Sequence, residues 1–77
     1  MPTEKARLLV VDDDADLRTT LPMILTGVGY NVQSAADGFS ALAKIRSELP
    51  DILITDLNMP GMSGFELLSV LVHARRA

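Results

Sequence analysis

Two continuous apolar runs, each leading into acidic residues, most constrain what this chain can fold into. The first run is Leu8–Val11, and Asp12 and Asp13 follow it directly. The second run is Ile52–Ile54, which leads through one threonine to Asp56. A run without polar alternation is typical of a β-strand that is covered on both faces, as in a parallel sheet. We therefore expect two buried parallel strands whose carboxyl ends carry carboxylates.

Helical periodicity around these runs predicts three strand–helix units. We expect strands at Arg7–Val11, Asn31–Ala35 and Asp51–Thr55, and helices at Asp16–Val28, Gly38–Leu49 and Gly64–Arg75. The second strand is the least apolar, which is typical of an edge position. Strands that alternate with helices indicate an α/β fold with a parallel sheet.

Local signals predict where the helices begin and which faces they bury. Asp14 and Asp37 are the expected N-caps of the first two helices, and Gly27 and Gly29 mark the end of the first. Pro22 lies inside the first helix and is expected to bend it. The stripes expected to be buried are Leu17, Leu21, Ile24, Leu25 and Val28 in the first helix, Phe39, Leu42, Ala43 and Ile45 in the second, and Phe65, Leu68, Leu71 and Val72 in the third.

Composition narrows the classes of protein that need to be considered. A chain of 77 residues forms one small domain at most. It has no cysteine, which excludes disulfides and thiolate metal sites and suits a cytoplasmic location. No apolar run approaches the roughly 18 residues that a membrane span needs. The net charge of −3 argues against direct contact with nucleic acid. We expect neither a membrane nor a nucleic-acid partner.

The acids at the strand ends predict a metal site. If the two apolar strands are parallel neighbours, Asp12, Asp13 and Asp56 converge at one edge of the sheet. Oxygen ligands without histidine or cysteine select a hard cation, Mg²⁺ in preference to Zn²⁺. A carboxylate beside bound Mg²⁺ can act as a nucleophile on a phosphoryl group. The alternative is that these acids only cap helices or lie in solvated turns.

Several motifs together resemble the receiver domain of two-component response regulators. They are Val10–Asp14, Tyr30–Val32, Ala36–Gly38, Ile54–Asp56 and Asn58–Gly64. The resemblance covers residues 7–77, after an amino-terminal tail of residues 1–6. It implies a flavodoxin-like (CheY-like) parallel sheet with three-layer α/β/α packing, of which only the first three strand–helix units are present.

The resemblance also implies a function and a set of site residues. Asp56 resembles the phosphoacceptor, and the Mg²⁺ ligands of the family correspond to Asp12, Asp13, Asp56 and the backbone carbonyl of Asn58. The phosphoryl donor implied is a histidine kinase or a phosphotransfer protein. The chain is then a signalling module in a phosphorelay and not an enzyme.

The sequence departs from the family by stopping after the third unit. The family's switch Ser or Thr after the fourth strand and its Lys after the fifth are absent, and Lys5 and Lys44 are not placed to replace that Lys. Phosphorylation is therefore expected to be slow or absent in isolation. The third strand becomes an edge, so self-association through this strand and the last helix is expected.

Two other functions stay open at this point. A fragment of the fold can serve as a protein-interaction module that binds Mg²⁺ without being phosphorylated. An aspartyl-phosphate hydrolase is also possible in principle, but such enzymes carry a second acid two residues after the nucleophile. Asn58 stands at that position.

Overall fold

Three parallel strands in the order β2–β1–β3 form the sheet that organises the chain. The computed structural model describes residues 5–56 and residue 69. In that part, the elements are β1 (Arg7–Val11), α1 (Ala15–Val28), β2 (Asn31–Ala35), α2 (Gly38–Ser47) and β3 (Ile52–Thr55). The predicted strands Arg7–Val11 and Asn31–Ala35 are confirmed, and the other ends differ by one or two residues. The predicted helix Gly64–Arg75 lies, except for Ser69, outside the described residues.

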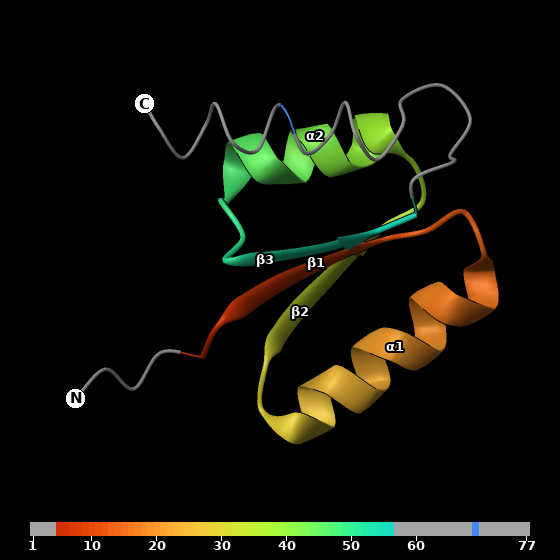
Figure 1. Cartoon of the computed structure of the whole chain (residues 1–77), viewed down its shortest axis with the longest axis vertical. Helices are drawn as coiled ribbons and strands as arrows, with labels where there is room; N and C mark the ends of the chain where they lie inside the picture. Colours follow the sequence, from red (N-terminus) through yellow and green to blue (C-terminus); the bar gives the residue numbers. More distant parts are fainter. Residues whose placement is uncertain (1–4, 57–68, 70–77) are drawn as a thin grey trace.

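The two helices lie on opposite faces of the sheet, with β1 at its centre (Figure 1). This arrangement confirms the predicted α/β/α layering and the edge position of β2. It also places β3 at the other edge of the described sheet, as the sequence predicted. The expected burial of this strand is wrong, however, because Ile52 and Ile54 are 44% and 38% exposed. The reason is that α1 packs mainly on β1 and β2 and does not cover this edge. Neither described helix has the length and apolar character that crossing a membrane requires.

The apolar run of β1 supplies both faces of the core. Leu9 and Val11 face α2, and they pack with residues of β2 and α2. Leu8 and Val10 point to the other face, because successive side chains alternate along a strand. All four are at most 4% exposed. The cluster on the α2 side consists of Leu9, Val11, Ala35, Ala41 and Ile45, with Leu49 and Leu53 packed against it.

The buried face of α2 differs from the predicted one. Ala41 and Ile45 are 0% and 3% exposed, whereas Phe39, which we expected in the core, is 64% exposed. Leu42 is half-buried and Ala43 is exposed. The helix begins at Gly38, which is itself buried, and its small residues let it approach the sheet closely. A bulky ring two positions before Ala41 then points away from the sheet.

The predicted stripe of α1 is also less buried than expected. Leu17, Ile24 and Val28 are 41%, 56% and 70% exposed, while Leu21 and Leu25 are half-buried. The reason is that α1 packs on β1 and β2 from one side, and this contact is narrower than the stripe. Periodicity therefore identified the apolar face correctly but overestimated how much of it the described part covers.

Both ends of α1 follow from local chemistry, as predicted. The Asp14 carboxylate accepts hydrogen bonds from the backbone N–H groups of Asp16 at 2.9 Å and of the next residue at 3.4 Å. The helix continues through Pro22 and also includes Gly27. It ends at Gly29, whose φ of 122° is a conformation that side chains disfavour.

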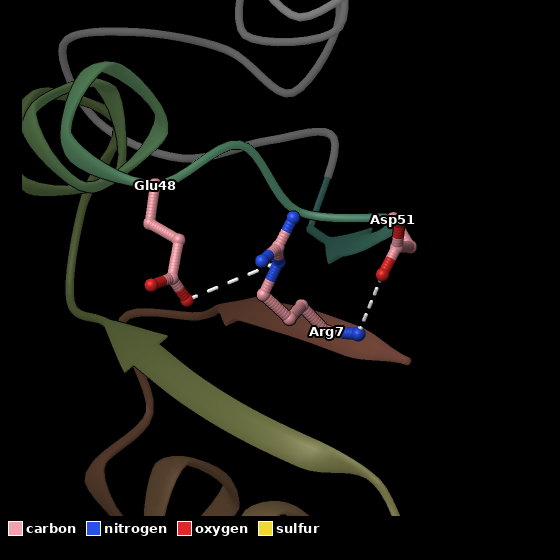
Figure 2. A network of polar contacts seen from close by, with 3 residues as sticks. All are labelled: Arg7, Glu48 and Asp51. Carbon is pink, nitrogen blue, oxygen red and sulfur yellow. Dashed lines mark hydrogen bonds and ion pairs between the residues drawn. The ribbon is translucent and has the colours of Figure 1, made fainter. Parts of the chain in front are cut away.

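A polar contact between the first residue of β1 and the residue before β3 aligns the two strands (Figure 2). The backbone N–H of Arg7 donates to Asp51 Oδ2 at 2.8 Å, and the backbone N–H of Asp51 donates to the carbonyl oxygen of Arg7 at 2.8 Å. Arg7 Nε also lies 3.9 Å from Glu48 Oε1. Both side chains of this ion pair are substantially exposed, so we expect it to contribute less than about 1 kcal/mol. The backbone contacts of Arg7 and Asp51 are therefore the part that fixes the register.

Substitutions on the two faces of α2 test this packing. Ile45→Ala is expected to lower the free energy of unfolding by about 2 to 4 kcal/mol, because it leaves a cavity in the core. Phe39→Ala is expected to change the free energy by no more than about 0.5 kcal/mol, because the ring is mostly exposed. Urea denaturation followed by circular dichroism measures both. A larger loss for Phe39→Ala than for Ile45→Ala would contradict the described packing.

Candidate metal and phosphoryl-acceptor site

The register of the sheet brings the acids of β1 and β3 to the same edge. Val11 and Thr55 are paired partners at the carboxyl ends of these strands. The next residues, Asp12 and Asp56, therefore leave the sheet side by side. The backbone N–H of Asp56 still donates to the carbonyl oxygen of Val11 at 3.2 Å, which keeps the two chains together at this point.

The predicted convergence of the three acids is confirmed in the structure. One carboxylate oxygen from each of Asp12, Asp13 and Asp56 lies within 4.8 Å of the other two. Asp12 is half-buried and Asp13 is exposed. Asn58, the remaining predicted ligand, lies outside the described residues. The structure thus places three carboxylates close together at the carboxyl ends of the parallel strands.

Backbone hydrogen bonds hold Asp12 in place. Its N–H donates to the carbonyl oxygen of Ala35 at 3.1 Å, which ties it to β2. Its Oδ1 accepts a hydrogen bond from the backbone N–H of Asp14 at 2.9 Å. The carboxylate of Asp14 is used as the cap of α1, and this residue does not take part in the cluster. Asp14 is thus the helix cap that the sequence predicted.

Arg18 is a site neighbour that the sequence reasoning missed. Its Nη1 donates to the backbone carbonyl oxygen of Asp12 at 3.0 Å, and the residue is half-buried. A basic residue near the amino-terminal end of a helix opposes the helix dipole. That unfavourable placement, shortly after a run of acids, was the available signal that Arg18 serves another purpose.

Asp37, after β2, is a further acid at this end of the sheet. Its Oδ1 accepts a hydrogen bond from the backbone N–H of Ser40 at 2.7 Å and so caps α2, as predicted. This hydrogen bond is the main reason that the pKa of Asp37 lies below its usual value of 3.8. Contacts with the Ser40 side chain and the Phe39 backbone, and the charge of Arg18, lower the pKa further, against a smaller opposing effect of desolvation.

The donor set of the cluster is suited to a hard divalent cation. All three side chains offer carboxylate oxygens, the ligand type that Mg²⁺ prefers. In an octahedral Mg²⁺ site, ligand oxygens about 2.1 Å from the ion lie roughly 3 to 4 Å apart. Oxygens that are already within 4.8 Å of one another need only small side-chain rotations to reach that spacing.

Comparison with known proteins decides the family. The sequence profile of the response regulator receiver domain matches residues 8–76. The chain belongs to this family. The receiver assignment confirms what the motifs at the strand ends predicted, and it makes the chain a domain of two-component signalling proteins.

Individual relatives agree with this assignment. The receiver chain is 42% identical over 71 residues to the DNA-binding response regulator MtrA of Mycobacterium tuberculosis. Its fold matches that of the chemotaxis protein CheY4 of Vibrio cholerae with a TM-score of 0.86 and 39% identity. It also matches the response regulator TrrA of Thermotoga maritima, solved in complex with Mg²⁺–BeF, with a TM-score of 0.83 and 37% identity. The predicted CheY-like fold is therefore confirmed.

The receiver chain is shorter than each of these proteins. The match with MtrA covers 92% of this chain and 31% of MtrA. The match with CheY4 covers 94% of this chain and 60% of CheY4, and for TrrA the shares are 92% and 62%. The DNA binding named for MtrA thus belongs to a protein about three times the length of the matched region.

The lowered pKa of Asp37 predicts a pH dependence of stability. A depressed pKa in the folded state means that the stabilising charge is present above pH 3.8 and is lost as the pH falls through the folded pKa. Asp37→Asn keeps a capping side chain but cannot titrate. The wild type is expected to be more stable than this variant near neutral pH, and the difference is expected to vanish in acid. Urea midpoints of the two proteins, measured from about pH 6 to about pH 3, test this. A difference that is independent of pH would contradict it.

Proposed function

We propose that the chain accepts a phosphoryl group on Asp56 from a histidine kinase or a phosphotransfer protein, with Mg²⁺ as the required cation. The observation that carries the proposal is the convergence of the Asp12, Asp13 and Asp56 carboxylates within 4.8 Å. Membership of the receiver family, matched over residues 8–76, is the reason for interpreting this convergence as a phosphoryl-acceptor site. The Mg²⁺–BeF complex of TrrA, a relative at 37% identity, supports the same choice of cation.

Each acid has a distinct role in this proposal. Asp56 is the proposed nucleophile, because its position directly after β3 corresponds to the phosphoacceptor of the receiver family. Asp12 and Asp13 would hold the cation, together with Asp56 and the backbone carbonyl of Asn58. When bound, Mg²⁺ neutralises the negative charge that otherwise keeps the incoming phosphoryl group away from the carboxylates.

Among the groups of this chain, the bond-making step of the transfer uses the Asp56 carboxylate. An oxygen of Asp56 attacks the phosphorus of a phosphohistidine, so that an O–P bond forms and the N–P bond breaks. The imidazole leaves with the electron pair of the broken bond and takes up a proton. The product on this chain is an acyl phosphate, and no general acid or base of the chain is required.

The partners that we propose follow from the same chemistry. The donor must present a phosphorylated imidazole to the edge of the sheet where the three carboxylates meet. A nucleic-acid partner is not proposed, because the chain carries a net charge of −3. We propose that the chain acts as a signalling module in the cytoplasm and has no turnover of its own.

The proposal predicts covalent modification of a single residue. Prolonged incubation of the chain with acetyl phosphate and Mg²⁺ is expected to raise its intact mass by one phosphoryl group, at a slow rate because the family's Ser or Thr and its Lys are absent from the sequence. Asp56→Asn is expected to abolish the increase, because an amide is not a nucleophile. Asp16→Asn is the matched control, since Asp16 lies in the first turn of α1 and is not part of the cluster, and it is expected to keep the increase.

The same experiment separates the alternatives. No mass increase, with a calorimetric signal for Mg²⁺ binding, would favour a protein-interaction module over a phosphoacceptor. Release of inorganic phosphate over many turnovers would favour the hydrolase. A mass increase that persists in Asp56→Asn would show that the phosphoryl group goes to another residue.

We also propose that the chain associates with a second copy through β3. This strand has no pairing partner on its outer side among the described residues, and its Ile52 and Ile54 are 44% and 38% exposed. An antiparallel contact with Leu53 opposite its own copy sets Ile52 opposite Ile54 on one face. It also sets Asp51 opposite Thr55, so that no two carboxylates within the strands oppose each other. The last helix, predicted as part of this contact, lies outside the described residues apart from Ser69.

A charged substitution on β3 tests this contact. Ile54→Lys is expected to shift sedimentation toward the monomer, because a charge on an edge strand opposes pairing. Ile24→Lys, on the exposed face of α1, is the matched control and is expected to leave the sedimentation unchanged. A wild-type chain that stays monomeric at all concentrations would contradict the proposal.

A further inference from the structure

Arg18 makes a contact that its own helix does not need. It is the fourth residue of α1, and its side chain reaches back to the end of β1. There its Nη1 donates to the backbone carbonyl oxygen of Asp12 at 3.0 Å. A cation near the amino-terminal end of a helix opposes the helix dipole, so the placement does not serve helix stability. Two interactions offset this cost: the hydrogen bond to Asp12 and the attraction between the charges of Arg18 and Asp37. Of these two, the hydrogen bond is the one made with a residue of the acidic cluster.

The carbonyl that Arg18 binds belongs to the peptide unit joining Asp12 to Asp13. The N–H of Asp12 is fixed by Ala35 at 3.1 Å, and its Oδ1 by the N–H of Asp14 at 2.9 Å. Arg18 fixes the other polar group of the Asp12 backbone, the carbonyl oxygen. The plane of this peptide unit determines the direction in which the Asp13 side chain leaves the backbone. The guanidinium therefore acts on two of the three acids of the cluster through one hydrogen bond.

We propose that Arg18 is a positioning residue for the acidic cluster, which holds the Asp12–Asp13 peptide in the orientation that directs both carboxylates toward a shared cation. The proposal rests on the proposed Mg²⁺ site. Arg18 touches neither the cation nor the phosphoryl group in this role. It acts through the backbone of Asp12.

The charge of Arg18 and its hydrogen bond to Asp12 predict opposite changes in Mg²⁺ affinity when Arg18 is replaced. One substitution therefore distinguishes the two effects. The positive charge of Arg18 alone repels a cation, so its removal would strengthen Mg²⁺ binding if charge were the only effect. Loss of the hydrogen bond frees the Asp12–Asp13 peptide and weakens Mg²⁺ binding. Arg18→Met removes both, and the sign of the change in affinity shows which effect is larger.

The experiment is isothermal titration of the 77-residue chain with MgCl₂. Arg18→Met is expected to weaken binding on the order of 10-fold, as substitutions of groups that orient metal ligands do. Arg18→Lys is expected to recover part of the loss, because an ammonium group can still donate to the carbonyl. Arg46→Met, which makes the same charge change in the last turn of α2, is the control and is expected to bind Mg²⁺ like the wild type. Equal or tighter binding by Arg18→Met would overturn the proposal.

A second readout needs no metal and separates this proposal from the proposed function. In the metal-free chain, the ¹³C resonances of the Asp12 carbonyl and the Asp13 Cα are expected to shift in Arg18→Met and to return toward the wild-type values in Arg18→Lys. Unchanged resonances in a folded Arg18→Met variant would overturn the positioning role. A wild-type chain that shows no Mg²⁺ binding, but in which these resonances shift as expected, would instead contradict the proposed function and leave Arg18 as the residue that orients the Asp12–Asp13 peptide.

Discussion

The register between β1 and β3 is the constraint on which the rest of the structure depends. The two hydrogen bonds between Arg7 and Asp51, one of which is drawn in Figure 2, align the strands at one end. The hydrogen bond from the backbone N–H of Asp56 to the carbonyl oxygen of Val11 continues the pairing at the other end. A shift of one residue would move β3 by about 3.3 Å and exchange the faces of its side chains. Leu53 would leave the core, and Asp56 would no longer stand beside Asp12. The hydrophobic pattern that buries the strand and the polar pairing that aligns it therefore specify the same site.

The site itself is a concentration of negative charge that the backbone maintains. Three carboxylates lie within 4.8 Å of one another although they repel. Their positions are set by groups that do not titrate: the sheet hydrogen bonds of Asp12 and Asp56, and the N–H of Asp14. A site held in this way keeps its geometry before any ligand arrives. Under the proposed function, a divalent cation held by these carboxylates would offset their mutual repulsion.

The same sheet also determines where the chain remains apolar on its surface. Helix α1 packs on β1 and β2 (Figure 1). Ile24 and Val28 of α1 and Ile52 and Ile54 of β3 remain exposed. The other large apolar side chains that the described core leaves exposed are Leu17, Met23 and Phe39. The acidic cluster lies at the carboxyl ends of the strands, whereas Ile52 and Ile54 lie on the edge strand β3. The proposed phosphoryl-acceptor site and the proposed association through β3 would therefore use different parts of the fold.

The sequence by itself determined the elements, their caps and the three acids of the cluster. These depend on local chemistry: apolar runs make strands, Asp14 and Asp37 accept hydrogen bonds from nearby N–H groups, and parallel strands end at a common edge. Only the tertiary structure decided that Ala41 and not Phe39 is buried, that the α1 stripe is half covered, and that Arg18 reaches the carbonyl of Asp12. Periodicity shows which residues share a face of a helix or strand. Burial and long side-chain contacts depend on which other element packs against that face. The residues near a position in the sequence do not determine that element.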